Sequence, residues 1–390
     1  MALIVQKYGG TSVADPERIR AVAEHVAFTK RHGNDVVVVV SAMGKSTDNL
    51  IKLANDVSSV QPARELDMLL TTGERISMTL VCMALAGVGI DAISFTGSQV
   101  GIITDTVHTK AKILEVKGDR VREALAQGKV CVVAGFQGVS TDKEITTLGR
   151  GGSDTTAVAL AAALDADSCE IYTDVTGVFS ADPRVVPAAR KLKTVTYDEM
   201  LELAASGAKV LHLRCVEYAR RYNLPIHVRS SFTTNEGTWV VKDHPQGGEM
   251  EQAIISGIAH DKSEAKITIV GVPDRTGVAA RIFQAIADAD INIDMIVQNV
   301  SAAATGLTDI SFTLPKDEGA DATAILQKLQ GEVGFASIQY DDQIGKLSLI
   351  GAGMRSHPGI TATFFGAMSE AGINIEMIST SEIRISIICR

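Results

Sequence analysis

The sequence has no stretch rich in lysine or arginine and carries an excess of acidic residues. Asp and Glu total 46 against 37 Lys and Arg, which gives a formal net charge of −9. Nucleic acids and anionic membrane surfaces bind basic patches, so neither is expected as the main partner. A phosphate ligand stays compatible with this composition, because a single anion site needs only a few local donors.

Cysteine and histidine are also sparse, and neither has the spacing of a metal site. The cysteines are Cys82, Cys131, Cys169, Cys215 and Cys389, and the eight histidines are equally scattered. We therefore expect reduced thiols in a cytoplasmic protein and no metal site built from side chains. Met1 leads into the apolar segment LIV and not into a signal peptide. No apolar run approaches the roughly 20 residues of a membrane helix, so no membrane association is expected.

The length of 390 residues predicts two or three domains. Hydrophobic residues at 46% and charged residues at 21% indicate packed cores and argue against disorder. Up to residue 230, strand patterns at 3–8, 35–40, 92–95, 129–134, 170–173 and 226–228 alternate with helical patterns that include 17–30, 153–164 and 198–222, the last interrupted at Gly207. Several strands are continuous Val/Ile runs, which is typical of strands buried on both faces. This order predicts an α/β fold with a largely parallel sheet between layers of helices.

The C-terminal part contains an internal repeat. KITIVGV at Lys266 recurs as KLSLIGAG at Lys346, and the segment ending in INIDMI recurs as one ending in INIEMI, at spacings of 80 to 82 residues. Each copy has the order strand, turn, amphipathic helix and strand, which indicates duplicated small domains. The composition shifts to polar residues and glycine at 233–248. The predicted divisions are 1–245, a linker and strand at 246–265, and two modules at 266–340 and 341–390.

Two glycine-containing loops follow the first two predicted strands. KYGGTS (7–12) offers close backbone approach at Gly9 and Gly10 and a point charge at Lys7, which suit an anion such as phosphate. SAMGKS (41–46) places Ser41 at the carboxyl end of a buried strand, where ligands bind in open α/β sheets. An ordinary turn is the alternative for each loop, and each motif taken alone leaves both open.

A third glycine-rich segment, TTLGRGGSDTT (146–156), is another candidate anion site. Gly151 and Gly152 precede Ser153, which has the side chain of an N-cap for the helix expected at 153–164. Arg150 can grip a carboxylate with two hydrogen bonds, and Asp154 faces the place where positive charge would gather. A glycine-serine helix start is common, but the flanking Arg and Asp are harder to explain structurally.

Charged residues elsewhere give weaker signals. YTDVTGVFSADPR (172–184) follows another strand, and its Asp174 and Asp182 suit a ribose, a base or a metal unless they only form turns. Glu74 and Lys209 lie on helical patterns, for which a solvated charge is the alternative.

Taken in order, KYGG, FTGSQ, GFQG, TTLGRGGSD, YTDV and ADPR resemble the aspartate kinases of the amino-acid kinase family, over essentially the whole chain. RELDMLLTTGERIS (64–77) resembles the aspartate kinases in particular, not the family's glutamate, acetylglutamate or uridylate kinases. The repeat resembles ACT domains, which are ferredoxin-like modules that bind amino acids. INIDMI and INIEMI resemble the effector loops of lysine-sensitive aspartate kinases. The resemblance implies the amino-acid kinase fold followed by two ACT domains.

This resemblance implies that ATP, with Mg²⁺, phosphorylates L-aspartate to 4-phospho-L-aspartate at the entry to lysine, threonine and methionine synthesis. A carboxylate nucleophile is ionised at neutral pH and needs no general base, which fits the lack of a candidate histidine. Lys7, Asp154 and Lys209 are the implied catalytic residues. The implied nucleotide contacts are Lys7, Gly9, Gly10, Ser41, Thr173, Asp174, Asp182, Arg184 and Lys209, and the implied substrate contacts are Thr47, Glu74, Arg150, Gly151, Gly152 and Ser153. Among these, Arg150 would clamp the α-carboxylate and Glu74 would pair with the α-ammonium.

The repeat is expected to bind lysine and threonine as feedback inhibitors, lysine alone being the next choice. Such effectors need donors, acceptors and an anion around their α-ammonium and α-carboxylate groups. The candidates are Asp274, Asn292, Ile293, Asp294 and Gln298 in the first copy, and Ile360, Thr361, Asn374, Ile375, Ser381 and Glu382 in the second. The alternative is that the Asn and Asp residues only form the turn between a helix and a strand. By resemblance, the assembly is a homodimer through ACT domains, or a heterotetramer with a regulatory subunit that starts near Met250.

Three departures from the family pattern affect these expectations. Thr176 stands where members often have Asp, and Phe179 where they often have Tyr, both near the expected nucleotide pocket. The second copy stops at Arg390, so its last helix and strand are expected to be missing and feedback control to be weakened. A strand from 253–259 is expected to complete that module.

Other functions are weighed against this one. A different kinase of the same family is disfavoured by the segment around Glu74, and a sensor protein with an inactive kinase domain by the presence of Lys7, Arg150, Asp154 and Lys209. A dinucleotide-binding oxidoreductase ranks last, because no G-x-G-x-x-G follows the first strand.

Overall fold

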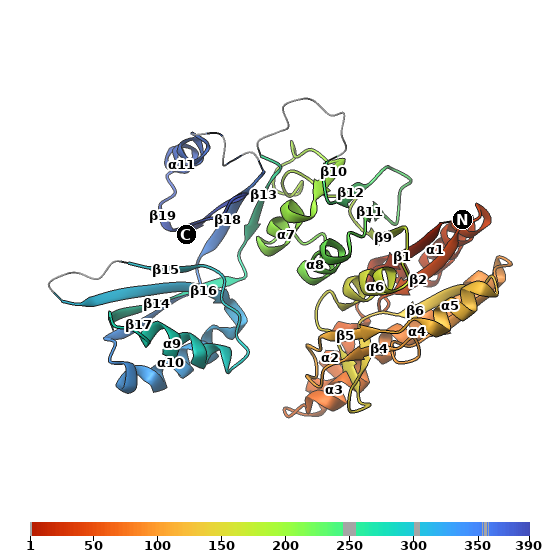
Figure 1. The fold of residues 1–390 in the computed structure, drawn as a ribbon, viewed down its shortest axis with the longest axis horizontal. Helices are drawn as coiled ribbons and strands as arrows, with labels where there is room; N and C mark the ends of the chain where they lie inside the picture. The colour runs from red at the N-terminus through yellow and green to blue at the C-terminus, as the bar shows by residue number, and fades with distance from the viewer. Residues whose placement is uncertain (1, 245–254, 300–304, 353, 355–356, 358) are drawn as a thin grey trace. The chain divides into compact units, whose positions relative to one another are not determined.

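The computed structural model describes residues 2–244, 255–299, 305–352, 354, 357 and 359–390. The chain divides into two compact units (Figure 1). The first comprises residues 1–205 and 209–250, and the second comprises residues 206–208 and 251–390. The predicted boundary at 245 falls within residues that the structure does not describe.

The first unit is built on a sheet in the order β10-β12-β11-β9-β1-β2-β6-β3. Its strands are β1 (Leu3–Tyr8), β2 (Asp35–Val40), β3 (Ala92–Phe95), β6 (Val130–Ala134), β9 (Ser168–Thr173), β10 (Thr194–Thr196), β11 (Ile226–Ser230) and β12 (Thr238–Val241). The pairs from β11 to β3 are all parallel, and β12 runs antiparallel to β11. The sheet is thus largely parallel, as the sequence predicts.

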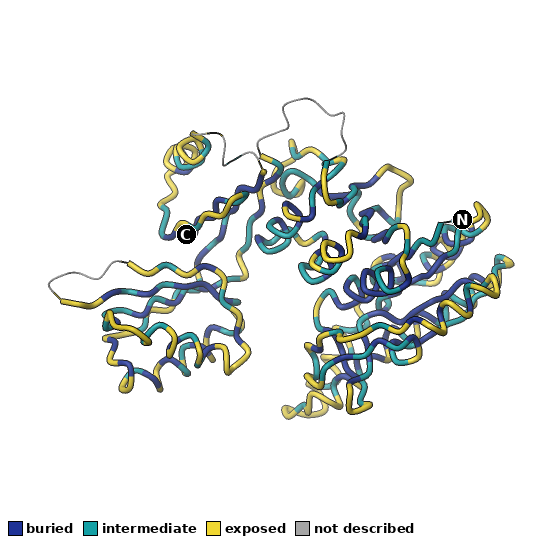
Figure 2. Tube along the Cα trace, in the orientation of Figure 1, coloured by how far each residue is buried: buried dark blue, intermediate teal, exposed yellow. Residues whose placement is uncertain are grey.

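Helices cover both faces of this sheet because its central strands are apolar on both sides. Val36 to Val40 are all fully buried, and Figure 2 shows the central strands as a continuous buried layer. Helices α1 (Pro16–Arg31) and α4 (Thr72–Gly87) pack together on one face. Helices α6 (Gly152–Ala163), α8 (Leu213–Tyr222) and α5 (Asp119–Ala126) pack on the other. The α/β sandwich is confirmed.

Two local predictions in this unit are wrong. The helical pattern over 198–222 forms two helices, α7 (Tyr197–Ala205) and α8, with the expected interruption at Gly207, which has a left-handed φ of +103°, but Lys209 was also expected on a helix. Lys209 lies in a turn and not on a helix. Ser153 does not cap α6, since the helix begins at Gly152 and Gly151 occupies the N-cap position without a side-chain hydrogen bond.

A second, smaller sheet in the first unit carries no clear sequence pattern. Its order is β5-β4-β7-β8, formed by β4 (Ile102–Thr104), β5 (Ile113–Val116), β7 (Gln137–Ser140) and β8 (Ile145–Thr147). These strands have three or four residues each, too few to show a period. Helix α3 (Ala63–Leu70) packs against β8, and α2 (Ser46–Val57) packs against α3.

The helical stretch Ala63–Gly87, formed by α3 and α4, is long and apolar enough to cross a membrane by length and composition alone. Here its C-terminal part is a core helix of the sheet. Met78, Val81 and Leu85 are buried against the strands in one hydrophobic cluster. The apolar composition of α4 is explained by this packing.

The second unit contains two modules that correspond to the sequence repeat. The first has the order β14 (Glu264–Pro273), α9 (Val278–Ala287), β15 (Ile296–Gln298), β16 (Leu307–Pro315), α10 (Gly319–Val333) and β17 (Ser337–Asp341). Its antiparallel sheet runs β15-β16-β14-β17, the ferredoxin-like order. Ile282 and Ile286 of α9 are buried on the sheet, as their helical spacing predicts.

The second module completes its sheet with a strand from earlier in the chain. It contains β18 (Gly345–Ile350), α11 (Ile360–Glu370), β19 (Ile375–Thr380) and β20 (Arg384–Cys389). The sheet order is β13-β18-β20-β19, in which β13 (Gly257–Asp261) holds the position that β17 holds in the first module. Antiparallel pairs run from Gly257↔Ile350 to Asp261↔Lys346. The paired segment thus lies a few residues after the expected 253–259, whose first residues fall outside the described part of the chain.

Candidate active site and regulatory modules

The loops that follow β1, β2 and β9 meet at one edge of the main sheet. Tyr8 is in register with Val40 of β2 and with Tyr172 of β9, so these strands end side by side. The amide of Gly9 donates to the Tyr172 carbonyl oxygen at 3.2 Å, and the amide of Ser41 donates to the Tyr8 carbonyl oxygen at 3.1 Å. Carboxyl ends of parallel strands are where ligands bind in such sheets. The KYGGTS, SAMGKS and YTDV motifs therefore converge.

Gly10 brings two of these loops into backbone contact. The amide of Gly44 donates to the Gly10 carbonyl oxygen at 2.9 Å. A Cβ atom at Gly10 would lie 2.9 Å from the Ala42 carbonyl oxygen and 3.2 Å from that of Gly44, so no larger residue fits without moving backbone. The close backbone approach predicted for Gly10 is therefore made to the neighbouring SAMGKS loop. This contact fixes the arrangement of the two loops at the sheet edge where Gly9 and Ser41 lie.

Lys7 and Asp154 form an ion pair at the same edge. Lys7 lies on β1 and Asp154 in the first turn of α6, with 2.5 Å between Nζ and Oδ1 and with both side chains nearly buried. The start of α6 fits closely on the sheet, because a Cβ at Gly135 would lie 2.8 Å from the Ser153 side chain. Lys7 is therefore held beside the positive end of a helix, where an anion is favoured.

Glu74 is buried at this edge, contrary to the solvated alternative for its helical position. It lies in the first turn of α4 with 3% exposure, and its Oε1 accepts a 3.0 Å hydrogen bond from the amide of Ala42. Its Oε2 has no hydrogen-bond partner among the described residues. Burial raises the pKa of Glu74 to about 7, although the bond from Ala42 opposes this. A buried carboxylate with an unsatisfied oxygen is suited to a cation.

The loop that carries Arg150 is fixed on both sides, while Arg150 itself is exposed. Arg214 donates to the Leu148 carbonyl oxygen at 2.8 Å and to that of Ala111 at 3.0 Å. Gly151 has a φ of +69°, and a Cβ there would lie 2.2 Å from the ring of His212. Arg150 makes no ion pair within the described residues, so its guanidinium is available to a ligand. Arg214 and His212 carry no signal in the sequence, because neither belongs to a recognisable motif.

The candidate nucleotide residues lie at the end of β9 and in the loop after it, where Thr173 and Asp182 are half-buried and Asp174 and Arg184 are exposed. The hydroxyl of Thr173 donates to Asp174 at 3.2 Å. Asp182 and Arg184 pair with each other, with 2.8 Å between Arg184 Nη2 and Asp182 Oδ2, and the Arg184 amide also donates to Asp182. The ADPR segment is thus a turn closed by its own side chains, and any role in nucleotide binding would use this preformed turn. Phe179 forms a β-bridge with Lys191.

The remaining candidates, Thr47 and Lys209, are more exposed. Thr47 is half-buried in the first turn of α2, directly after the SAMGKS loop. Lys209 is exposed in the turn between α7 and α8. No contact in the described structure joins Lys209 to Lys7. No group of three His, Cys, Asp or Glu side chains gathers in a metal-binding arrangement among the residues that the structure describes.

The INIDMI and INIEMI segments of the two modules meet each other. Met295 and Met377 are buried in one small cluster with Ile344 and Ile388. Asp294 lies 2.8 Å from the Nζ of Lys346, a buried lysine that also pairs with Glu264. An effector role for Asp294 would therefore compete with an ion pair that the sequence pattern did not indicate.

The other candidate effector residues lie at turns, at strand ends and, for Ile360 and Thr361, at the start of α11. Asp274 is exposed in the turn between β14 and α9, and its amide donates to the Gly306 carbonyl oxygen at 2.9 Å. The others are Asn292, Ile293 and Gln298 in the first module, and Ile360, Thr361, Asn374, Ile375, Ser381 and Glu382 in the second, of which Ile293, Ile360 and Ile375 are half-buried and the rest exposed.

Two parts of the chain match known families. Residues 2–230 match the amino acid kinase family, and residues 267–330 and 347–390 match an ACT domain. The first match covers more than half of the chain. The protein therefore belongs to the amino acid kinase family and carries ACT-domain sequence after its kinase domain.

Its relatives define the branch of that family. The aspartokinase of Mycobacterium tuberculosis is 64% identical over 394 residues, covering 100% of this chain and 93% of that protein. Aspartokinase III of E. coli in complex with aspartate and ADP (R-state) shows the same fold, with a TM-score of 0.85 at 24% identity over 99% of this chain and 96% of that one. Its complex with lysine and aspartate (T-state) has a TM-score of 0.73 at 25% identity over 99% and 95%. The chain is an aspartokinase and hence a phosphotransferase.

Proposed function

We propose that the protein transfers the γ-phosphoryl group of ATP to the side-chain carboxylate of L-aspartate, giving 4-phospho-L-aspartate and ADP. The observation that carries the proposal is the buried Glu74, which leaves one carboxylate oxygen unsatisfied beside the loops of Lys7 and Gly10. An α-ammonium group would satisfy that oxygen and remove the cost of burying the charge.

The substrate would be held at both ends of its α-carbon. Glu74 would pair with the α-ammonium, and the exposed guanidinium of Arg150 would bind the α-carboxylate in a bidentate fork. The loop before Arg150 is anchored by Arg214 through the Leu148 carbonyl, so the clamp would be positioned before the substrate arrives. The side-chain carboxylate would then be free to face the phosphoryl group.

Phosphoryl transfer would need charge stabilisation and alignment but no general base. The aspartate carboxylate is already ionised at neutral pH, so its oxygen attacks the γ-phosphorus as the bond to ADP breaks and no proton moves. Lys7, held by Asp154, would stabilise the charge on the transferred group. Mg²⁺ carried by the nucleotide would neutralise phosphate charge, and Asp154, which also orients Lys7, would help to hold it.

Regulation by lysine and threonine at the ACT modules is part of the proposal. It is supported by the two ferredoxin-like modules and by the lysine complex of the E. coli relative. The enzyme would then catalyse the first step in the synthesis of lysine, threonine and methionine, in the cytoplasm. It would act as a homodimer through its ACT domains or together with a separate regulatory subunit. Feedback requires that the effector bind one conformation more tightly than another.

An ATP-dependent hydroxamate assay tests the proposal, because hydroxylamine traps an acyl phosphate. The assay is run with L-aspartate and with L-glutamate, each with and without lysine and threonine. We expect hydroxamate from aspartate that the effectors suppress. Activity that neither effector changes would reject the feedback part alone, and absence of hydroxamate from aspartate would reject the reaction.

A further inference from the structure

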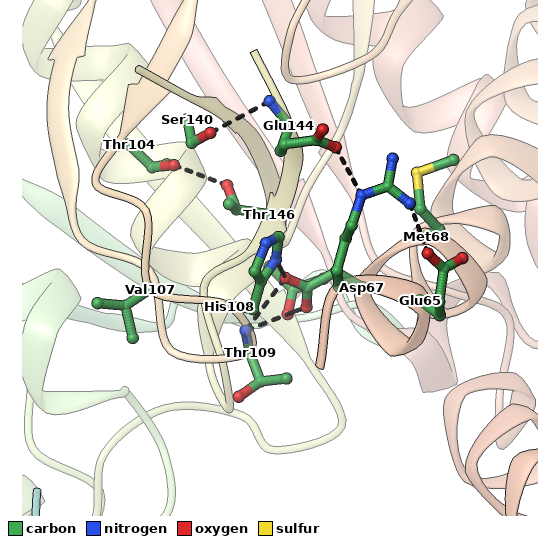
Figure 3. A network of polar contacts seen from close by, with 12 residues as sticks. Glu65, Asp67, Met68, Thr104, Val107, His108, Thr109, Ser140, Glu144 and Thr146 are labelled. Carbon is green, nitrogen blue, oxygen red and sulfur yellow. Dashed lines mark hydrogen bonds and ion pairs between the residues drawn. The ribbon is translucent and has the colours of Figure 1, made fainter. Parts of the chain in front are cut away.

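Asp67 is a fully buried carboxylate in the RELDMLLTTGERIS segment, and no role has been assigned to it above. It sits on α3, has 0% exposure and accepts hydrogen bonds through both oxygens (Figure 3). Nδ1 of His108 lies 2.7 Å from Oδ2, the hydroxyl of Thr147 lies 2.5 Å from Oδ1, and the amide of Thr109 lies 3.1 Å from each. The carboxylate therefore joins α3 to two segments of the small sheet that are distant in sequence.

Such a group is costly to bury unless its charge is fully hydrogen-bonded. An apolar side chain of similar size would fill the site without that cost, so the carboxylate is explained better by the geometry that it fixes than by stability. The amide of Thr109 illustrates this, because Thr109 has a left-handed φ of +67°, which a β-branched residue rarely adopts. Asp67 supplies the acceptor that holds this conformation.

The contacts of Asp67 lead to the two ends of the proposed amino-acid site. Along α3, the Thr71 amide donates to the Asp67 carbonyl oxygen at 3.1 Å, and the chain continues with a helical conformation at Thr71 into α4 and Glu74. Residues 67 and 74 are seven positions apart, about two helical turns, and so lie on one side of this stretch. On the other branch, Thr147 ends β8, three residues before Arg150.

The segment around Thr109 also contacts the turn that precedes Arg150. The turn before Arg150 contains Gly149, whose φ is +76° and where a Cβ would lie 3.1 Å from the Thr109 carbonyl oxygen. The amide of Ala111 also donates to the Thr147 carbonyl oxygen at 2.9 Å. The backbone that presents Arg150 therefore rests on the segment that Asp67 holds in place.

We propose that Asp67 is a positioning residue that sets the spacing between Glu74 and Arg150, and thereby selects aspartate over the dicarboxylic amino acid with one more methylene group. This inference rests on the proposed function, since it assumes that Glu74 and Arg150 bind the two α-substituents. When Glu74 and Arg150 hold the α-ammonium and α-carboxylate at a fixed spacing, the side-chain carboxylate of the substrate reaches the phosphoryl group only if the substrate side chain has one particular length.

The test is Asp67→Asn, which keeps the shape but loses the charge and one acceptor oxygen. Because a displacement near 1 Å can cost about 100-fold in rate, we expect the KM for L-aspartate to rise about tenfold or more while the KM for ATP changes less than about twofold. The ratio of kcat/KM for aspartate to that for glutamate should fall about tenfold. The wild-type protein is assayed in parallel, so that a failure of the proposed reaction itself is seen separately.

Arg64→Gln is the matched control. Arg64 also joins α3 to the β7–β8 hairpin, through Glu144 at 2.9 Å, but both side chains are exposed. Removing an exposed pair should leave both KM values and the aspartate preference unchanged. Thr147→Val removes only the hydroxyl donor to Asp67 and should raise the KM for aspartate about threefold.

A folded Asp67→Asn protein with the wild-type KM for aspartate, or with equal rises in the KM values for aspartate and ATP, would overturn the proposal. If that variant does not fold, the decision passes to Thr147→Val. An unchanged aspartate KM and an unchanged aspartate preference in Thr147→Val would overturn it as well.

Discussion

Lys346 and Asp294 form an ion pair between the two ACT modules, with 2.8 Å from Nζ to Oδ2. The residues at the equivalent positions of the sequence repeat form a second ion pair. Lys266 holds the place of Lys346 in the other copy, and it forms an ion pair with Glu376, which holds the place of Asp294. Each module thus gives its strand lysine to the acidic residue of its partner's N-I-[DE]-M-I segment. Such reciprocal contacts are typical of two-fold symmetric interfaces, and here they join two copies within one chain.

Lys346→Met is predicted to destabilise the second unit. The Lys346 side chain is 1% exposed and also pairs with Glu264, which is 12% exposed. Burial lowers the pKa of Lys346, but Glu264 and Asp294 outweigh this and leave the pKa raised. Removing one partner of a buried pair leaves uncompensated charge, so we expect a loss of about 3 kcal/mol in unfolding free energy, measured by urea denaturation.

The control for this variant is Arg281→Gln. The Arg281–Glu332 pair lies in the same unit and has good geometry, but its side chains are 45% and 55% exposed. Its loss should change the unfolding free energy by less than about 0.5 kcal/mol. If Lys346→Met costs no more than Arg281→Gln, the ion pairs between the modules do not stabilise the unit.

Glu74→Gln is predicted to make the ligand-free protein more stable at neutral and alkaline pH while it weakens substrate binding. The pKa of Glu74 is raised by burial from 4.5 to about 7, so the folded state binds this proton more tightly than the unfolded state. The stabilisation by the protonated form is complete below about pH 4.5 and is lost as pH rises through about 7. The total is about 3 kcal/mol at 1.36 kcal/mol per pKa unit.

Urea unfolding of the wild type and of Glu74→Gln at pH 4.5 and pH 8 measures this effect. We expect the variant to gain stability relative to the wild type only at the higher pH, and to have a higher KM for aspartate. Equal pH dependence of the two proteins would show that Glu74 is ionised without penalty in the folded state. At a given concentration, added L-aspartate should stabilise the wild type more than Glu74→Gln if its ammonium pairs with Glu74.

The main elements of the fold follow from the sequence because their signals are local. The run from Val36 to Val40 predicts a strand buried on both faces, and the glycines at 9 and 10 predict a close approach after β1. The repeat predicts two similar modules because it preserves the apolar positions of each helix and strand. The convergence of the loops after β1, β2 and β9 follows from the parallel order of those strands.

What the sequence could not predict depends on contacts between distant residues. The burial of Glu74 is decided by the Ala42 amide and that of Asp67 by His108, Thr109 and Thr147, none of which shares a motif with its partner. The interruption at Gly207 follows from the sequence, but the turn at Lys209 does not, because a single glycine does not show how many residues leave the helix. The pairing of Lys346 with Asp294 required the arrangement of the two modules.

Gly10→Ala is predicted to impair nucleotide use without unfolding the protein. Its Cβ would lie 2.9 Å from the Ala42 carbonyl oxygen, a backbone atom that cannot move aside alone. The loops at the sheet edge would have to separate, so we expect kcat/KM for ATP to fall about 100-fold. Gly87→Ala is the matched control, because that position ends α4 with no atom within 4 Å and should leave activity unchanged. Equal kinetics for the two variants would refute a tight contact at Gly10.

Arg150→Ala is predicted to raise the KM for aspartate with little effect on the KM for ATP. Arg150 is exposed and makes no ion pair within the described residues, so its loss should not destabilise the folded protein. A charge-assisted bidentate pair contributes about 3 kcal/mol, which corresponds to an increase of about 100-fold in KM. Arg150→Lys keeps the charge but not the planar fork, so it should restore only part of the affinity.

The comparison of Arg150→Ala with Glu74→Gln then separates the two ends of the substrate. Loss of the α-carboxylate clamp should be insensitive to pH between 6 and 8, because neither a guanidinium nor an α-carboxylate titrates there. Binding through Glu74 should weaken as the pH falls through about 7, where its carboxylate takes up a proton. The KM for aspartate is measured as the pH is lowered in the wild type, in Arg150→Ala and in Glu74→Gln. A KM that rises in the wild type and in Arg150→Ala but not in Glu74→Gln would assign the α-ammonium to Glu74 and leave the α-carboxylate to Arg150.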